Sequence, residues 1–600
     1  MAFLTRHNIV LLVLTALFGL ILYRCAWVTD DAYITLRTVD NFVNGYGLRW
    51  NTTERVQTYT HPLWMFALTA VYFFTREAFY STLFLSILIS TTAFLWFTLK
   101  VAASTRAAIL GACILICSKA FIDFSTSGLE NPLTHLLLVL FFWIYFNSEV
   151  TPQTLFKLAL IVALSVLNRM DTLLLFSPPL AWAFWGVRTK QGIRAALLGF
   201  TPFIIWECFA LFYYGFLLPN TVYAKLNTGI FALPLAKQGL FYLWYSTRLD
   251  PLIPLILIAG LTLPFVFKRS KQIPIAIGVL CYLLYVVKVG GDFMAGRFLA
   301  APIFCATVLL SQHTFEKMAP WALSLGGALL ISLASTYTPL LSGADYGIGR
   351  GGMRERGIED QRGFLYRHAG LLSRKDRAEP THHWADDGRI ARKKAPCVVA
   401  NGAVGYYGFY AGPQVHIVDI YALTDPLLAR LPAGNPVAWR IGHFARKIPH
   451  DYQSTLLVGQ NMFRDRRLAA YYNKLSFVTR GNLWSSKRLL TIWELNTGQH
   501  DHLINFDYHW HQYYGRYLES LNHPEEAEYH YQKMLALDPE RPDSWYFWSK
   551  VQLRRGNLDT AHQAIQKALV LDPSQSDYAR QRLKIGRDYY LQGQTDLGQS

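Results

Sequence analysis

The first 341 residues hold long apolar runs that recur along the chain with only short polar breaks. A stretch of about 20 mostly apolar residues is long enough to cross the hydrocarbon core of a bilayer. Charged residues make up only 16% of the chain, and most of them fall in residues 342–600. Soluble domains carry roughly 25% charged residues. The sequence therefore predicts a polytopic membrane protein whose C-terminal part is water-soluble.

We expect about eleven transmembrane helices in this apolar half. Their approximate bounds are 9–27, 79–99, 107–122, 133–147, 155–168, 171–187, 195–218, 251–267, 272–289, 298–312 and 321–341. Several of these runs are shorter than the ~20 residues that a span usually needs, so their ends are approximate. Segment 61–75 is also apolar, and we expect it to lie in the outer membrane interface without crossing fully.

Basic residues set the orientation, because loops on the cytoplasmic side of a membrane carry excess Lys and Arg. Three loops carry such residues, around Lys100 and Arg106, in 188–194 and in 268–271. Placing all three inside a bacterial inner membrane puts the N-terminus in the cytoplasm and residues 342–600 outside. The same bias contributes to the net charge of +17. We therefore expect a membrane partner and no nucleic-acid partner.

Two adjacent carboxylates, Asp30 and Asp31, directly follow the first apolar run. Acidic groups near hydrocarbon are costly unless they meet water or a cation. Such a pair can take a proton from a sugar hydroxyl as a general base. It can also hold a divalent cation such as Mg²⁺, Mn²⁺ or Ca²⁺ through its oxygens. A solvated loop or a helix cap explains the pair equally well, so the pair alone does not identify a site.

Four further motifs interrupt the apolar pattern, and the predicted topology puts all of them on the same outer face as the acidic pair. They are 126–132 with Glu130, 168–171 with Arg169 and Asp171, 219–225 with Asn220 and Lys225, and 290–298 with Asp292 and Arg297. The long first loop adds Arg55 and His61 before an aromatic segment. Loops that meet at one rim of a rigid scaffold commonly form a functional site.

The first loop, which reads DDAYITLRTVDNFVNGYGLRWNTTERVQTYTHPLW over 30–64, and the four motifs resemble GT-C membrane glycosyltransferases. The most similar group is the one that contains the actinobacterial terminal β-arabinofuranosyltransferase. The resemblance covers about residues 1–345 and continues more weakly to about 445. It implies a helical bundle with a long first outer loop and a sugar donor linked to polyprenyl phosphate.

The resemblance also implies roles for particular residues. Asp30 and Asp31 match an acidic pair that is associated with catalysis or metal binding. The residues that match the later motifs are Glu130, Arg169, Asp171, Asn220, Lys225, Asp292 and Arg297.

These residue types suit the departure of a lipid phosphate. Arg binds phosphate through a planar fork, and Lys binds it as a point charge. Stabilising the charge that builds on a leaving group is usually the largest catalytic term. We therefore expect Lys225 and Arg297 to contact the phosphate, and we favour Asp30 over Asp31 as the base. Arg169 and Asp171 are equally explained by a structural salt bridge.

The C-terminal part divides into three segments. We expect a linker or mobile loop in 342–394, a small α/β domain in 395–505 with strands near 396–401 and 415–421, and helical repeats in 506–600. Asp538 recurs as Asp572, and Ala527 as Ala561, at the 34-residue period of tetratricopeptide repeats. Such repeats form concave binding surfaces, so a protein partner is expected there.

The sequence thus predicts a mainly α membrane enzyme that moves a sugar from a polyprenyl phosphate to a glycan, lipid or protein acceptor of the cell envelope. A lipid-linked oligosaccharide ligase is the enzymatic alternative. A lipid-sugar transporter would place its polar groups and broken helices near the membrane midplane, whereas the acids here gather at one rim. A membrane-anchored assembly scaffold would need a much shorter anchor.

Overall fold

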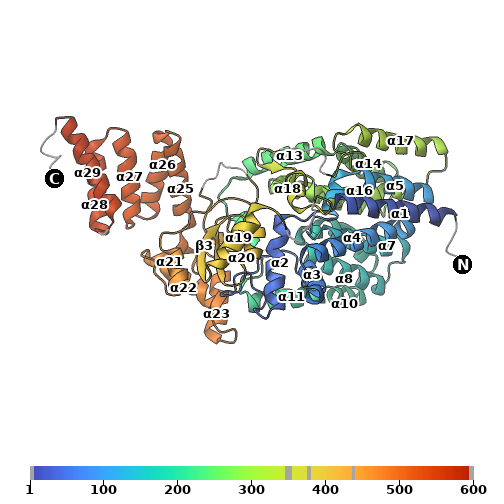
Figure 1. The fold of residues 1–600 in the computed structure, drawn as a ribbon, viewed down its shortest axis with the longest axis horizontal. Coiled ribbons are helices and arrows are strands. Elements are labelled where there is room, and N and C mark those ends of the chain that lie inside the picture. Colours follow the sequence, from blue (N-terminus) through green and yellow to red (C-terminus); the bar gives the residue numbers. More distant parts are fainter. Residues whose placement is uncertain (1–5, 345–353, 374–379, 435–439, 574, 594–600) are drawn as a thin grey trace.

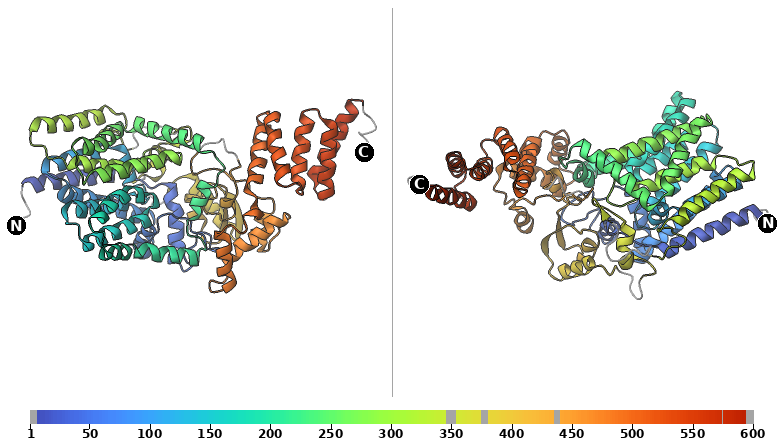
Figure 2. Two further views of the ribbon diagram at one scale, coloured as in Figure 1. Left: turned by 180° about the vertical axis from the view of Figure 1, so that it is seen from behind. Right: turned by 90° about the horizontal axis from the view of Figure 1, so that it is seen from above.

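A computed structural model describes residues 6–344, 354–373, 380–434, 440–573 and 575–593. The described chain is mainly helical and elongated, and helices α1 (Arg6–Cys25) and α29 (Ser576–Leu591) lie at opposite ends of it (Figures 1 and 2). A helical bundle forms one half of the molecule. The second half contains a small strand-bearing region and a row of helices.

Each predicted span falls on one or two helices of the bundle. After α1 these are α4 (Phe79–Trp96) with η1 (Phe97–Val101), α5 (Thr105–Cys117), α6 (Lys119–Phe124), α7 (Asn131–Asn147), α8 (Pro152–Asn168), η2 (Met170–Thr172), α9 (Leu173–Gly186), α10 (Lys190–Gly199), α11 (Thr201–Tyr213), α14 (Leu252–Val266), α15 (Ile273–Lys288), η3 (Arg297–Leu299), α16 (Ala300–Ser311) and α17 (Met318–Ala334). Helix α13 (Ala232–Leu249) packs beside α15 and precedes α14.

Two helical stretches in the described residues, 7–25 and 79–101, are long and apolar enough to cross a membrane. The number rises to 4 if the bent pairs α10–α11 and α13–α14 each count as one span. The other apolar helices are 10–17 residues long. The structure therefore contains apolar helices of the kind found in membrane proteins, and the number of about eleven spans stays a prediction.

Large apolar side chains point outward from the bundle. Leu20, Ile258, Leu284 and Leu323 are each more than half exposed, and they come from four different helices. Exposing so many apolar side chains to water would be unfavourable. Exposing them to lipid tails is not, because the tails are as apolar as leucine. The outer surface of the bundle thus suits a bilayer.

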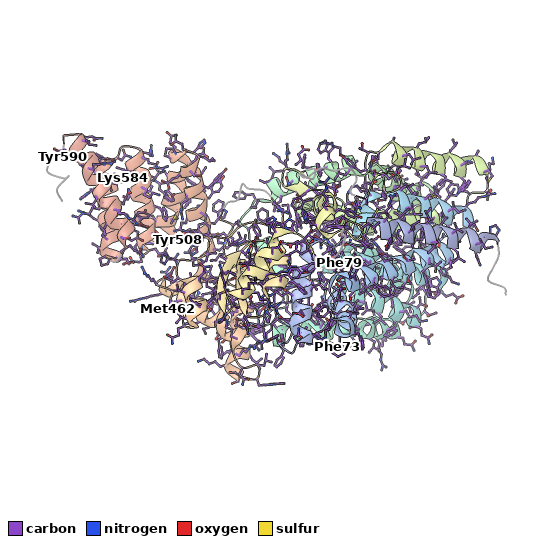
Figure 3. The ribbon with its side chains drawn as sticks, viewed as in Figure 1. Phe73, Phe79, Met462, Tyr508, Lys584 and Tyr590 are labelled. Atoms are coloured by element: carbon purple, nitrogen blue, oxygen red, sulfur yellow. The ribbon has the colours of Figure 1, made fainter. Side chains whose placement is uncertain are left out.

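Two helices of the first loop lie at the rim of the bundle. Helix α2 (Asp30–Val43) stands across the direction of the bundle helices, between them and the strand-bearing region (Figure 1). Helix α3 (Pro62–Thr75) has 14 residues and therefore spans about 21 Å, less than the ~30 Å of a hydrocarbon core. Its Phe73 is exposed at the surface of the bundle (Figure 3). These features favour the expected interfacial position of segment 61–75.

The described parts of 342–394 differ from the expected linker or mobile loop. They form a hairpin of β1 (Arg354–Glu355) and β2 (Ile358–Glu359), followed by α18 (Gln361–Ala369) and α19 (His383–Lys393). Lys119 forms buried ion pairs with Asp123 and with Asp360 of this segment. Buried charges need partners of opposite sign. Sequence composition does not show which residues will pair in this way, so it did not predict that this segment packs on the bundle. Residues 345–353 and 374–379 lie outside the described part.

The strand-bearing region, called the α/β unit below, comprises the described residues of 395–505. Strands β3 (Cys397–Asn401) and β4 (Val415–Asp419) pair in parallel and are joined through α20 (Tyr406–Ala411), which confirms both predicted strands. The elements that follow are η4 (Leu428–Arg430), α21 (Tyr452–Val458), α22 (Arg466–Arg480), α23 (Ser486–Asn496) and α24 (Asp501–Ile504). The short helix α12 (Asn220–Leu226), which comes from the loop after α11, packs against η4.

The last part of the chain is a row of helices, each packed against the next. They are α25 (Phe506–Ser520), α26 (Pro524–Leu537), α27 (Pro542–Arg554), α28 (Leu558–Leu571) and α29. Helices α26 and α28 both have 14 residues. Ala527 and Ala561 occupy equivalent positions in them, and both are fully buried. The sequence period is thus matched by a structural period.

The row of helices docks on the rest of the molecule through a few side chains. Arg541 is paired with Asp465 of the α/β unit at 2.6 Å, and Arg467 is paired with Asp538. Trp510 lies against the loop after α12, with its ring 5.9 Å from that of Phe231. The two apolar clusters inside the row contain only residues of the row itself.

We predict that truncation after residue 505 leaves the remaining chain folded, because the removed helices form their apolar clusters among themselves. The truncated protein should elute from a sizing column in detergent as one symmetric peak, at a yield near that of the full chain. Full-length protein with Trp510→Ala is the matched control, since it loses one docking contact and keeps the row. Aggregation of the truncated protein alone would show that the bundle needs the row for folding.

Candidate active site

Glu130 stands at the centre of a buried cluster of charges. Its Oε1 accepts hydrogen bonds from Arg169 at 2.8 Å and from Arg297 at 3.3 Å, and its Oε2 lies 3.4 Å from His61 Nδ1. Burial alone would raise the pKa of Glu130, but the two guanidinium groups outweigh it and hold that pKa well below its usual range. Glu130 is therefore an anion that joins three loops.

Each arginine of this cluster has a second carboxylate partner. Arg169 forms two parallel hydrogen bonds to Asp171, at 2.7 and 2.8 Å. Arg297 reaches Asp292 at 3.3 Å. Arg297 follows Gly296, whose φ of +79° is readily adopted only by glycine. The structure thus contains the salt bridge considered for Arg169 and Asp171, and it links that bridge to Glu130 and Arg297.

His61 links the cluster to the first loop. Its Nε2 lies 2.8 Å from Thr35 Oγ1 on α2, while its Nδ1 faces Glu130. Burial lowers the pKa of His61 to about 4, so the imidazole is neutral at physiological pH. His61 therefore acts as a neutral bridge that fixes α2 relative to the charged cluster.

Lys225 has no hydrogen-bond or ion-pair partner for its ammonium group within the part of the chain that the structure describes. The side chain of Lys225 is exposed at the surface, the surrounding protein lowers its pKa by limiting its contact with water, and the largest opposing charge is that of Asp292. Arg297 likewise has a buried Nε that donates to no described group. The exposed ammonium of Lys225 is thus free to bind an anion, whereas the enclosed Nε of Arg297 contributes its positive charge.

The two aspartates at the start of α2 face different surroundings. Asp30 is buried, and its Oδ1 accepts the backbone N–H of Tyr406 at 2.6 Å. The backbone of Gly405 passes so close that a Cβ there would lie 2.0 Å from the Asp30 carbonyl oxygen. Burial raises the pKa of Asp30 to about 7. Asp30 is therefore covered by the α/β unit.

Asp31 has no hydrogen-bond or ion-pair partner in the described ranges and is only partly buried. Burial raises its pKa, and the charges that oppose this most are those of Arg297 and Lys225. The carboxylate of Asp31 thus lies in the electrostatic field of Lys225, which has no described partner, and of Arg297, which is paired with Glu130 and Asp292. Of the two aspartates, Asp31 is the one open to a ligand held by these cations.

Arg440 is a basic residue whose charge acts on the acidic pair and which the sequence analysis did not identify. Its positive charge acts on both Asp30 and Asp31. Its guanidinium lies 4.7 Å above the ring of Phe293 and 3.4 Å from a carboxylate oxygen of Glu359. It follows a stretch, 435–439, that lies outside the described residues. No local motif marks it, and only the fold brings it near α2.

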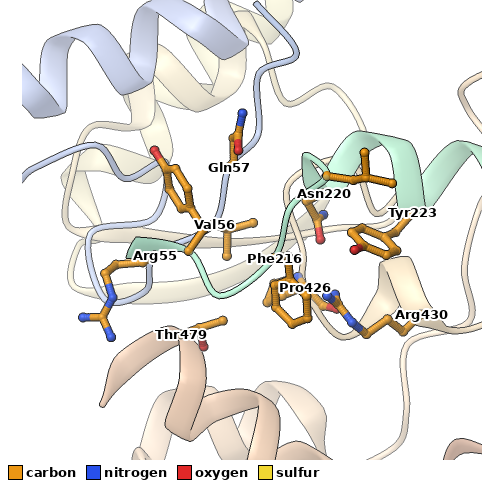
Figure 4. A pocket seen from close by; sticks show the side chains of 11 residues that line it. Arg55, Val56, Gln57, Phe216, Asn220, Tyr223, Pro426, Arg430 and Thr479 are labelled. Atoms are coloured by element: carbon orange, nitrogen blue, oxygen red, sulfur yellow. The ribbon is translucent and has the colours of Figure 1, made fainter. Parts of the chain in front are cut away.

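Two expected substrate contacts lie away from the charged cluster. Asn220 donates its amide hydrogens to the backbone oxygens of Ala422, Leu423 and Asp425, at 2.9 to 3.1 Å. Arg55 donates to backbone oxygens at the end of α22. Figure 4 shows both side chains at a separate small pocket with Tyr223 and Arg430. Both side chains connect loops of the bundle to the α/β unit. Neither forms a hydrogen bond with Asp30 or Asp31 in the described structure.

The acidic pair offers few side-chain ligands for a metal ion. Among the described residues, no group of three or more His, Cys, Asp or Glu side chains could hold a metal ion. Asp30 and Asp31 offer two carboxylates, the number with which Mg²⁺ binds when a substrate phosphate supplies further oxygens. The divalent cation stays a prediction.

Comparison with known proteins identifies two curated relatives. The chain is 30% identical over 336 residues to the terminal beta-(1->2)-arabinofuranosyltransferase of Mycobacterium tuberculosis, which covers 48% of this chain and 53% of the relative. It is 28% identical over 345 residues to the protein of the same name from Corynebacterium glutamicum, which covers 48% of each.

The chain thus spans about half the length of the curated relatives it matches. No family model matches it, and no solved structure matches it. The predicted resemblance to the terminal arabinofuranosyltransferases is confirmed.

We predict that Glu130→Gln destabilises the fold, because it leaves Arg169 and Arg297 with less negative charge in a buried site. Removing one partner of a buried ion pair typically costs about 3–5 kcal/mol. Thermal unfolding in detergent should show a clearly lower midpoint than for the wild type. Glu149→Gln, at an exposed position, is the matched control and should unfold like the wild type. An unchanged midpoint for Glu130→Gln would mean that the cluster adds nothing to stability.

Proposed function

We propose that this chain is a GT-C type membrane glycosyltransferase that moves one sugar from a polyprenyl phosphate to an acceptor of the cell envelope. The names of its relatives suggest an arabinofuranosyl group as the sugar. The observation that carries the proposal is that neither the carboxylate of Asp31 at the start of α2 nor the ammonium of Lys225 has a partner among the described residues, while each group's charge acts on the other. A base facing an anion site is what such a transfer requires.

The reaction needs one bond to form and one to break. The acceptor hydroxyl oxygen bonds to the anomeric carbon, and the bond from that carbon to the phosphate oxygen breaks. The hydroxyl proton passes to Asp31, and the polyprenyl phosphate leaves with the electron pair. Lys225 and Arg297 stabilise the negative charge on the phosphate. Glu130 and Asp292 keep the Arg297 fork in place, so little reorganisation is needed during the reaction.

The geometry favours Asp31 as the base, although the sequence favoured Asp30. Asp31 is partly exposed and lies in the field of Lys225 and Arg297, whereas an oxygen of Asp30 is already occupied by the N–H of Tyr406. Asp30 then has a positioning role, because its hydrogen bond joins the first turn of α2 to the α/β unit. Burial raises the pKa of both groups above that of an ordinary aspartate, which suits a base working near neutral pH.

The architecture supports the same proposal. About eleven apolar helices would cross the inner membrane, with α1 beginning on the cytoplasmic side. The acidic pair and the α/β unit would then lie on the extracytoplasmic face. The row of helices α25–α29 would be tetratricopeptide repeats, since the 34-residue period of the sequence is the one typical of that family. Its surface would bind a protein partner.

The competing classes receive less support. In the described structure the charged cluster lies where loops meet at the ends of α7, α8 and α16, whereas a transporter needs its site between broken helices at mid-depth. A scaffold has no use for a base that faces free cations. An oligosaccharide ligase would use the same chemistry with a larger donor. Mass spectrometry of the product distinguishes the two enzymes, because it measures the size of the transferred group.

We predict that Asp31→Asn lowers turnover by roughly 10²–10⁴-fold, the usual contribution of a general base. Asp30→Asn should lower it less, because only the position of α2 is affected. Turnover and binding of the donor lipid are measured separately in purified protein, and donor binding should change little, since Lys225 and Arg297 remain. Asp40→Asn, a change of the same kind at the other end of α2, is the matched control. A greater loss for Asp30→Asn would reverse the two roles.

We predict that Ser486 faces the extracytoplasmic side and Lys190 the cytoplasm. Single cysteines are placed at each position in a protein without its native thiols, and intact cells are treated with an impermeant thiol reagent. Both residues are exposed, so accessibility should depend on the side of the membrane alone. Ser486→Cys should react in intact cells, and Lys190→Cys only after the inner membrane is breached. The opposite pattern would invert the topology.

A further inference from the structure

A cavity of about 580 Å³ lies between α12 and the helices of the α/β unit, away from the charged cluster. The residues that characterise its lining are Phe216, Tyr223, Arg430, Tyr471, Asp501 and Phe506. Four of these are aromatic and two are charged. Cavities of this size accommodate small ligands or a short stretch of a polymer.

The aromatic side of the cavity is held rigidly. The Arg430 guanidinium lies 4.1 Å from the ring centre of Phe216 and 4.8 Å from that of Tyr223. Arg430 is buried and also donates to the Pro426 carbonyl at 2.6 Å. A guanidinium fixed against two ring faces orients both rings. The two rings and the Arg430 guanidinium thus form a preformed wall of the cavity.

Polar groups in the lining complement these rings. No hydrogen bond or ion pair engages the exposed carboxylate of Asp501 within the described ranges. Asn496 uses its amide hydrogens on two backbone oxygens and keeps its amide oxygen as an acceptor. A carboxylate and an amide oxygen accept hydrogen bonds from hydroxyl groups. Ring faces carry negative charge and attract the slightly positive C–H groups of a ligand.

The short helix α12 connects this cavity to the proposed reaction centre. Tyr223 and Leu226 line the cavity, and a spacing of three residues places them on one face of a helix. Lys225 is two residues from Tyr223, so it projects from the opposite side. The cavity and the ammonium of Lys225 therefore lie on two sides of one helix, whose diameter with side chains is roughly 10–12 Å.

A second path runs along the first loop. The small pocket of Figure 4 shares Phe216, Tyr223 and Arg430 with the large cavity, and it is also lined by Gln57. The backbone oxygen of Gln57 accepts the N–H of Asn220 at the start of α12. His61, which contacts Glu130, follows Gln57 after three intervening residues. The cavity thus adjoins the loop that leads to the charged cluster.

We propose that this cavity is a subsite for an acceptor oligosaccharide, which binds several sugars away from the one that receives the new residue. This inference rests on the proposed function and names the acceptor class as a glycan chain. Sugars offer C–H faces to Phe216, Tyr223 and Phe506, and they offer hydroxyl groups to Asp501 and Asn496. A lipid tail would leave these polar groups without partners, which is costly.

The test measures binding of a hexasaccharide of arabinofuranose to the purified full-length chain by ligand-observed NMR, with maltohexaose for comparison. Phe506→Ala and Asp501→Ala should each weaken hexasaccharide binding at least tenfold. Trp484→Ala, which removes an exposed aromatic ring of the same unit outside the cavity, should bind like the wild type. Equal affinity in all variants, or no binding of either oligosaccharide to the wild type, would overturn the proposal.

A second measurement separates this proposal from the proposed function. The two cavity variants should raise KM for a hexasaccharide acceptor at least tenfold, while kcat and KM for a disaccharide acceptor stay near the wild type. Transfer that proceeds without any change in these variants would eliminate the subsite and leave the enzyme. Binding of the hexasaccharide without any sugar transfer would retain the subsite and eliminate the transferase.

Discussion

The ion pairs of Glu130 with Arg169 and Arg297 are the interaction on which the rest of the site depends. A carboxylate that is 1% exposed is stable only when cations surround it. Meeting that need brings the start of α7, the turn after α8 and the turn before α16 to one point. Because Glu130 and Asp292 take up only part of the donors of Arg297, a buried N–H remains available at the edge of the cluster.

Helix α12 is held in place by the α/β unit. At its start, Asn220 binds three backbone oxygens of the unit. At its end, Arg446 donates to the backbone oxygens of Ala224 and Asn227 at 2.6 and 3.1 Å. A helix of two turns would not be stable alone, so these contacts fix where Lys225 stands. The position of one catalytic candidate is thus set by residues more than 200 positions later in the chain.

The α/β unit also closes over α2. Arg37 is buried and donates to the backbone oxygens of Trp50, Gly408 and Val415 at 2.6 to 2.8 Å. This places Gly405 and Tyr406 against Asp30 and leaves Asp31 as the accessible carboxylate. The two adjacent aspartates, equivalent in sequence, become different groups because a helix turns by about 100° per residue and only one side of α2 is covered.

The apolar runs, the strands at 396–401 and 415–421 and the helical period were determined by the sequence itself, because each is a local pattern of burial. The motifs around Glu130, Arg169, Lys225 and Arg297 were also visible in it, as charges that interrupt apolar segments. Tertiary structure decided that Asn220 and Arg55 bind backbone, that Arg440 approaches the acidic pair and that residues 354–369 pack on the bundle. These depend on contacts between distant segments, where the partner of a charge is set by packing and leaves no trace in local composition.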